Sequence, residues 1–296
     1  MNIYYVDGEF VAEDRAAISV NDLGVIRGYG VFDFMRTYKM RPFFLEDHIR
    51  RLETSARLIE LAMPRTRREI FGITMETLSR NRGHMTEAAV RIVITGGVSP
   101  DGITPPSAAR LLVMVTPHHP CPAEWYRDGA AVITTPDERY LPGAKSTHYI
   151  PAILALSRAH RQGAMESLYV DRTHRLLEGT TSNVFAFIGE RLVTPGASIL
   201  PGITRQVVMA LAGIEFNVEV RDIHRDEIRV MDEVFITSSN KEVVPVVSLD
   251  GLTVGDGSPG PRTRRIMELF AACTRAYGEG NQGYEAAGEG QGHGNP

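Results

Sequence analysis

The sequence predicts an α+β protein of two domains, and three observations support this prediction. The chain has 296 residues, whereas one domain contains roughly 150. The segment 117–122 has three prolines in six residues, which resists helix and sheet and is the best domain boundary. Strand-like and helix-like patterns occur in both halves and alternate through the second. We expect an N-terminal domain at 1–117, a linker at 118–125 and a second domain at 126–277.

The composition describes an ordinary soluble globular protein, with 43% hydrophobic and 23% charged residues. A net charge of −4 gives no reason to expect a nucleic-acid or membrane-surface partner. Cys121 and Cys273 are isolated cysteines, which fits a reducing compartment. The N-terminus lacks the basic-then-apolar order of a signal peptide, and no apolar run is long enough to cross a bilayer. We therefore expect a cytoplasmic protein.

Periodicity and turn residues predict the elements of the N-terminal half. Apolar residues recur at helical spacing through 45–62, and Pro64 ends this helix. Thr66 and Glu69 form a capping box for the next helix. The elements expected are a hairpin at 2–6 and 9–12, a strand that follows Gly28 and Gly30 and runs to residue 38, a helix at 45–62, a second helix capped by Thr66 that runs to about 81, and strands at 88–95 and 110–116.

The second half alternates strands and helices. A helix at 149–161 has Ile150, Ile153 and Leu154 on its apolar face. Residues 278–296 are rich in glycine and lack periodicity, which predicts a disordered tail. The other elements expected are strands at 130–135, 168–170 and 176–178, a hairpin at 183–188 and 191–194, a helix that opens with 201–205 and runs to about 212, strands at 234–237 and 243–247, and a helix at 261–276.

Lys145 and Glu178 carry the functional hypothesis. Lys145 lies just ahead of the helix at 149–161, and Glu178 ends a strand beyond it. A lysine amine can bond covalently to the aldehyde of pyridoxal phosphate, and a carboxylate can keep the ring nitrogen protonated. A single lysine or glutamate is usually a solvated surface residue. The hypothesis therefore depends on their joint spacing and on phosphate-binding segments elsewhere.

Other candidate residues each have a simpler alternative. Arg51 shares a helix flank with His48 and Ser55, and its side chain reaches either solvent, the simpler expectation, or an anion. Arg91 is the one charge in the strand at 88–95, and its partner is a neighbouring carboxylate, slightly favoured, or a substrate. The helix start at 201–205 is an anion site or, more simply, an ordinary N-cap.

The segment 238–240 adds small polar residues that can donate hydrogen bonds to a phosphate. His118 and His119 suggest a metal, but nothing nearby completes a ligand set, so no metal is expected.

Six segments in this order resemble the class IV (fold type IV) pyridoxal-phosphate aminotransferases. This family includes branched-chain aminotransferases, D-amino-acid aminotransferases and aminodeoxychorismate lyase. The resemblance extends from about residue 3 to about residue 276. The segments are GYGVF at 28–32, HIRRL at 48–52, GAKSTHY at 143–149, EGTTSN at 178–183, GITR at 202–205 and TSS at 237–239.

The resemblance implies a small α/β N-terminal domain, a larger pseudo-barrel C-terminal domain and at least a homodimer. Lys145 would hold the cofactor and move the substrate proton, and Glu178 would pair with the ring nitrogen. The phosphate would be held by Arg51, the N–H groups of Ile203 and Thr204, and Ser239. The substrate side would be lined by Phe32, Arg91, Tyr149 and Ser238.

The leading function is a ping-pong transfer of an amino group between a branched-chain or other apolar amino acid and a 2-oxo acid. Arg91 and Tyr149 resemble the branched-chain pattern, and Gly96 stands where the D-amino-acid type carries a substrate-gripping arginine. Asp33, where branched-chain enzymes carry Glu, and a one-residue difference in the spacing from Lys145 to Tyr149 depart from that pattern. The compact length and the sequence at 28–33 lean toward the D-amino-acid type.

Three alternatives on the same scaffold remain: a D-amino-acid transaminase, an aminodeoxychorismate lyase-like enzyme that releases pyruvate without an acceptor, and a catalytically silent homologue. A dinucleotide-binding oxidoreductase is disfavoured because the chain has no strand-GxGxxG-helix unit.

Overall fold

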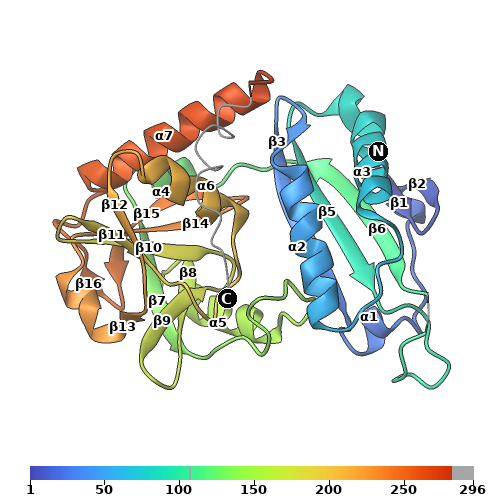
Figure 1. Cartoon of the computed structure of the whole chain (residues 1–296), viewed down its shortest axis with the longest axis horizontal. Coiled ribbons are helices and arrows are strands. Elements are labelled where there is room, and N and C mark those ends of the chain that lie inside the picture. The colour runs from blue at the N-terminus through green and yellow to red at the C-terminus, as the bar shows by residue number, and fades with distance from the viewer. Residues whose placement is uncertain (107, 282–296) are drawn as a thin grey trace, which may run out of the picture. The chain divides into compact units, whose positions relative to one another are not determined.

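The computed structural model describes residues 1–106 and 108–281, and these form two compact units (Figure 1). The N-terminal unit comprises Met1–His119 and Leu141–Ile150. The C-terminal unit comprises Pro120–Tyr140 and the described residues from Pro151 onward. The segment that carries Lys145 thus packs with the N-terminal unit, although it comes after the proline-rich boundary.

The N-terminal unit is built on a six-stranded antiparallel sheet in the order β2-β1-β6-β5-β3-β4. Its hairpin and central strands follow the predicted pattern. The bounds are β1 (Ile3–Val6), β2 (Glu9–Ala12), β3 (Gly30–Tyr38), β4 (Arg41–Pro42), β5 (Ala88–Thr95) and β6 (Arg110–Pro117). Short helical turns are η1 (Glu13–Arg15), α1 (Leu23–Ile26) and η2 (Arg82–His84).

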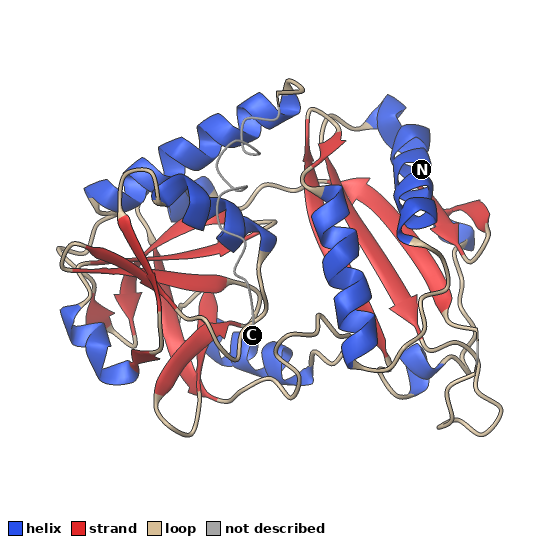
Figure 2. Ribbon diagram, in the orientation of Figure 1, coloured by secondary structure: helices blue, strands red, loops and turns tan. Residues whose placement is uncertain are grey.

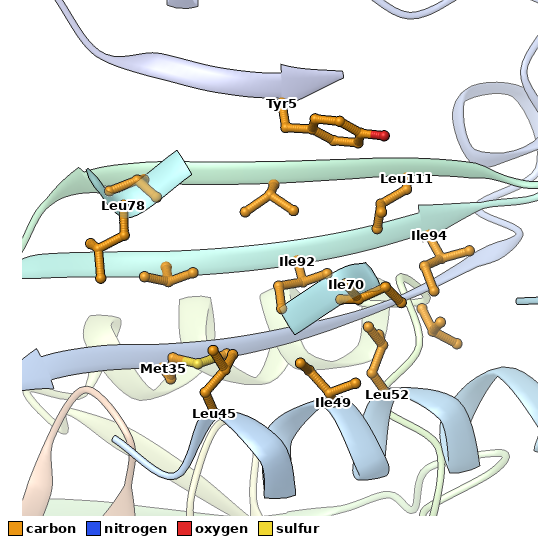
Figure 3. Packing of buried hydrophobic residues seen from close by; sticks show 14 of the residues in the cluster. Tyr5, Met35, Leu45, Ile49, Leu52, Ile70, Leu78, Ile92, Ile94 and Leu111 are labelled. Atoms are coloured by element: carbon orange, nitrogen blue, oxygen red, sulfur yellow. The ribbon is translucent and has the colours of Figure 1, made fainter. Parts of the chain in front are cut away.

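Two helices, α2 (Leu45–Leu58) and α3 (Arg67–Asn81), cover one face of this sheet (Figures 1 and 2). Side chains alternate across β3, so Val31 and Met35 face the helices while Phe32 and Phe34 are only half-buried on the other face. Figure 3 shows the resulting core, in which Leu45, Ile49 and Leu52 of α2 lie close to residues of the sheet that include Met35, Ile92 and Ile94.

The ends of these helices follow local chemistry. The predicted capping box at Thr66 is confirmed, since Glu69 N donates to Thr66 Oγ1 and Thr66 N donates to the Glu69 carboxylate. The prediction that α2 reaches residue 62 is wrong, because the helix ends at Leu58. Glu60 adopts a left-handed backbone with φ 56°, which turns the chain before Pro64 can stop the helix.

The C-terminal unit contains a ten-stranded mixed sheet that curls on itself (Figure 2). Its order is β12-β11-β10-β14-β15-β7-β8-β9-β13, and β16 pairs with β15. The strands are β7 (Ala130–Pro136), β8 (Glu166–Val170), β9 (Arg175–Gly179), β10 (Asn183–Ile188), β11 (Arg191–Thr194), β12 (Asn217–Val220), β13 (Ile223–His224), β14 (Glu233–Ser238), β15 (Glu242–Leu249) and β16 (Leu252–Thr253). The helical segments are α4 (Ala123–Arg127), α5 (Ile150–Arg161), α6 (Ile203–Ala212), η3 (Arg225–Val230) and α7 (Pro261–Gly278).

The apolar face expected on the helix at 149–161 is not the buried face of α5. Ile150, Ile153 and Leu154 are 65%, 61% and 54% exposed, whereas the buried residues are Ala152, Ala155 and Ala159. The spacing of apolar residues reports their hydrophobicity but not their size. Small alanine side chains let a helix backbone approach a sheet closely, so the alanine face of α5 is the buried one.

The predicted tail at 278–296 begins at the last residue of α7, and residues 282–296 lie outside the described part of the chain. No helix in the described ranges is both long and apolar enough to cross a membrane.

Candidate active site

The backbone around Lys145 is held by two elements of the N-terminal unit. Phe32 N donates to Lys145 O at 2.9 Å, and Thr147 N donates to Gly30 O at 3.0 Å. The Ser55 hydroxyl on α2 accepts from Lys145 N at 3.0 Å. The segment that carries Lys145 therefore pairs with the start of β3 like an additional edge strand. These hydrogen bonds fix the position of the Lys145 backbone, from which the side chain extends.

The Lys145 side chain lies against Phe32, with Nζ 4.7 Å from the ring centroid. The whole chain has three lysines, at positions 39, 145 and 241. Lys39 is exposed at the turn between β3 and β4, and Lys241 pairs with Glu166 at 3.2 Å. Of the three, Lys145 contacts the aromatic residue predicted to line the substrate side. Because the chain has three lysines, counting them would have limited the candidates for the cofactor-binding lysine from the sequence alone.

The other predicted substrate residues of this unit also lie close to the Phe32 ring. The ring of Tyr149 meets it edge-on, with centroids 5.4 Å apart. Arg91 lies directly across the sheet from Phe34, and its guanidinium carbon is 5.9 Å from the Phe32 ring centroid and 5.7 Å from that of Phe34. Arg91 is exposed and forms no ion pair with any acidic residue in the described part of the chain. A structural carboxylate partner for Arg91, the slightly favoured alternative, is therefore not found there.

Arg51 is held by a buried carboxylate and does not extend into solvent. Its Nε and Nη2 donate to the two oxygens of Asp33 at 2.9 and 2.7 Å, and the same carboxylate lies 2.7 Å from His48 Nδ1. Arg51 is only 8% exposed, so the simpler alternative from the sequence is wrong. A bidentate pair of this kind fixes the plane and direction of the guanidinium. Asp33 therefore orients the residue expected to bind phosphate.

The charge states of this cluster follow from its partners. Burial acts to raise the pKa of Asp33, but Arg51 and His48 outweigh it and hold that pKa well below its usual range. Burial lowers the pKa of His48, although Asp33 opposes the effect. The folded chain thus keeps a charged Asp33–Arg51 pair beside a histidine biased toward its neutral form.

We expect Asp33→Asn to lower the free energy of unfolding by about 3 kcal/mol at neutral pH, because it leaves a buried guanidinium without its charge partner. Asp33 has a depressed pKa in the folded chain, so its stabilising effect is present above its unfolded pKa of about 4 and is lost as the pH falls below it. The gap between wild type and Asp33→Asn should therefore narrow in acid. Urea denaturation at several pH values measures both effects.

The matched control is Asp47→Asn on α2, the helix that carries Arg51, because the Asp47 partner Arg50 is exposed. Its effect should stay below about 1 kcal/mol. A gap between wild type and Asp33→Asn that widens in acid would contradict the assignment of Asp33.

In the C-terminal unit, Glu178 is a buried carboxylate on β9. Leu200 N donates to its Oε2 at 2.9 Å, and Asn183 Nδ2 lies 3.3 Å from the same oxygen. Arg139 Nη1 is 3.4 Å from Oε1. The sequence did not single out Arg139, which stands in a loop without periodicity. A buried, fixed carboxylate of this kind is the acceptor that a protonated ring nitrogen requires.

The other predicted residues of this unit converge on Asn183. Gly202, the N-cap of α6, approaches so closely that a Cβ there would lie 2.0 Å from Asn183 Oδ1. Gly202 has no side chain to cap the first turn, where the N–H groups of Ile203 and Thr204 lack intrahelical acceptors. Thr237 pairs in register with Asn183. The turn with half-buried Ser238 and Ser239 is therefore at the same end of the sheet as Glu178.

Residues 30–249 match the family model described as amino-transferase class IV. The chain belongs to this family. Among curated relatives, a Methanocaldococcus jannaschii protein provisionally assigned as a branched-chain-amino-acid aminotransferase is 34% identical over 286 residues, covering 93% of this chain and 97% of its own. A D-alanine aminotransferase of Listeria monocytogenes is 32% identical over 285 residues, with the same two coverages.

The aminotransferase also resembles solved structures. The branched-chain amino acid aminotransferase of Escherichia coli superposes with a TM-score of 0.88 at 27% identity, over 96% of this chain and 98% of its own. A Mycobacterium tuberculosis protein described as a hypothetical aminotransferase, in its pyridoxal-phosphate-bound form, superposes with a TM-score of 0.80 at 26% identity, over 93% of this chain and 99% of its own. These likenesses confirm the predicted fold type IV architecture, and the enzyme uses pyridoxal phosphate.

The residues described above fit this cofactor. In the N-terminal unit Lys145 would provide the amine, and in the C-terminal unit Glu178 would provide a buried carboxylate and the start of α6 N–H groups for the phosphate. When bound, the cofactor supplies an electron sink for the substrate carbon.

Proposed function

We propose that this aminotransferase takes the amino group from a branched-chain or similar apolar L-amino acid and passes it to a 2-oxo acid in a ping-pong cycle. The observation that carries this proposal is the surface around Phe32. Phe34 lies beside it on β3, and Val93 lies directly across the sheet on β5. A half-buried apolar surface with one exposed guanidinium, that of Arg91, suits a substrate with an apolar side chain and a carboxylate.

In this proposal Lys145 binds the cofactor covalently and moves the proton on and off the substrate Cα. Glu178 accepts the hydrogen bond from the ring nitrogen. Arg51, oriented by Asp33, acts on the phosphate together with the N–H groups of Ile203 and Thr204 and the hydroxyl of Ser239. The substrate side comprises Phe32, Arg91, Tyr149 and Ser238.

A panel of donors tests the substrate class. We expect L-leucine to give a larger kcat/KM than D-leucine, D-alanine or L-alanine with 2-oxoglutarate as acceptor. The visible absorption band of the bound cofactor should shift when L-leucine is added without acceptor. A preference for D-alanine would reject the branched-chain proposal. Pyruvate release from aminodeoxychorismate without any oxo acid would instead support the lyase.

A D-amino-acid transaminase is the second candidate, and the D-alanine aminotransferases among the relatives support it. The packing at Gly96 weighs against it. A Cβ at this position would lie 2.4 Å from the ring of Tyr29, so a substrate-gripping arginine there requires the ring to move. The donor panel separates the two candidates directly.

We also propose that the enzyme is a cytoplasmic homodimer or higher homo-oligomer. The free thiols of Cys121 and Cys273 support a reducing compartment. The exposed Ile150, Ile153 and Leu154 on α5 support an apolar contact between copies. Sedimentation velocity that gives a monomer at micromolar concentration would reject the oligomer.

A further inference from the structure

Glu166, the first residue of β8, is a fully buried carboxylate with five hydrogen-bond donors around it. Three are consecutive hydroxyls of one turn: Thr180 Oγ1, Thr181 Oγ1 at 2.8 Å and Ser182 Oγ at 3.1 Å. The others are Ser167 N at 3.0 Å and Lys241 Nζ at 3.2 Å. Three neighbouring hydroxyls on one buried carboxylate order a turn whose polar side chains would ordinarily face solvent.

Lys241 brings a second turn to the same carboxylate. It follows Ser238 and Ser239 in the turn between β14 and β15, and its N donates to Ser238 Oγ at 3.2 Å. Its Nζ also donates to Thr181 Oγ1 at 2.5 Å. The Glu166–Lys241 ion pair thus joins the turn that begins after Glu178 to the turn that carries the two serines.

The carboxylate also packs against the backbone beside Glu178. A Cβ added at Gly179 would lie 3.2 and 3.3 Å from Glu166 Cγ and Cδ. Burial acts to raise the pKa of Glu166, but Lys241 and the threonine hydroxyls outweigh it, so the pKa is lowered. Glu166 therefore stays ionised, and the loss of its partner Lys241 leaves an uncompensated carboxylate charge in the interior.

We propose that Glu166 and Lys241 are positioning residues that lock the turn at 179–183 and the turn at 238–241 to each other. Through this lock, Glu178 and Asn183 on one side and Ser238 and Ser239 on the other keep one fixed spacing for the ring and the phosphate of pyridoxal phosphate. This inference rests on the proposed roles of Glu178 and Ser239. Neither Glu166 nor Lys241 touches the cofactor in this assignment.

The test compares Glu166→Gln and Lys241→Met with Glu233→Gln in the full-length enzyme. Glu233 is a matched control, because it is a buried carboxylate of the same unit that pairs with Arg262 and accepts from Thr263 N, at the other end of β14. The readouts are the dissociation constant for pyridoxal phosphate, kcat and KM for the best donor, and the thermal midpoint.

We expect Glu166→Gln and Lys241→Met to weaken cofactor binding about 10- to 100-fold, the same range as when groups that orient the ligands of a metal site are removed. Glu233→Gln should lower the thermal midpoint but leave cofactor affinity within about twofold, since it removes the buried charge that pairs with Arg262 at the end of β14 opposite the serine turn. In the double variant Glu166→Gln/Lys241→Met, the loss of cofactor-binding free energy should not exceed the sum of the losses in the two single variants.

Unchanged cofactor affinity in a folded Lys241→Met variant would overturn the proposal, and this variant decides if Glu166→Gln fails to fold. An equal loss of affinity in Glu233→Gln would also overturn it, because general destabilisation would then explain the effect. Failure of the proposed function is a separate result, in which the wild-type protein itself binds no pyridoxal phosphate.

Discussion

Replacing Lys145 with alanine is expected to abolish both transamination and the visible absorption band of the bound cofactor. The amine that holds the cofactor and the base that moves the Cα proton are the same group in the proposed mechanism. A positioned acid-base group contributes up to about 10,000-fold, and the covalent attachment is lost as well. The turnover number should therefore fall at least about 10,000-fold, and its measurement with the donor found best in the panel checks this.

The chain offers matched controls for this result because it has three lysines. Lys39→Ala, at the exposed turn after β3, should keep both the band and the turnover. Borohydride reduction of the wild-type enzyme followed by peptide mapping should place the cofactor on the peptide that contains Lys145. A label on the Lys241 peptide, or a normal band in Lys145→Ala, would reject the assignment of the catalytic lysine.

Glu178→Gln should lower kcat about 100- to 1,000-fold, the loss typical when one preorganised electrostatic contact to the reacting system is removed. The amide keeps the size of the side chain and an oxygen able to accept from Leu200 N and Asn183, so the local packing survives. It lacks the negative charge that keeps a ring nitrogen protonated. The measurements are kcat at saturating cofactor and the pH dependence of the cofactor's visible spectrum.

Glu233→Gln again provides the comparison, since it neutralises another buried carboxylate of the same unit without touching the proposed site. Its kcat should remain near that of the wild type. If fully loaded Glu178→Gln enzyme has wild-type kcat and an unaltered spectrum, Glu178 does not pair with the ring nitrogen.

Most elements of the fold were predictable because their signals are local. The capping box at Thr66, the hairpin at β1 and β2, and the strand pair β10 and β11 each depend on residues within a few positions of one another. Elements without a local signal were missed. β12 is a short strand of mixed polarity that is stabilised by parallel pairing with β11, a partner distant along the chain.

The candidate site residues also divide into those with a local sequence signal and those without one. Lys145 and Glu178 were singled out because each belongs to a contiguous segment whose residue types suit one chemistry. Arg139 was missed because its proximity to Glu178 spans 39 residues of sequence. The expected solvent exposure of Arg51 was wrong because its partner, Asp33, is 18 residues away on another element.

By itself the sequence determined most of the elements, the family and the cofactor, since these depend on short ordered motifs. The tertiary structure decided which side chains meet. It placed the Lys145 segment on β3, buried Arg51 beside Asp33, and joined Glu166 to Lys241 across 75 residues. The physical reason is that a buried charge requires a partner, whereas the position of that partner along the chain depends on the pairing and packing of whole strands and helices.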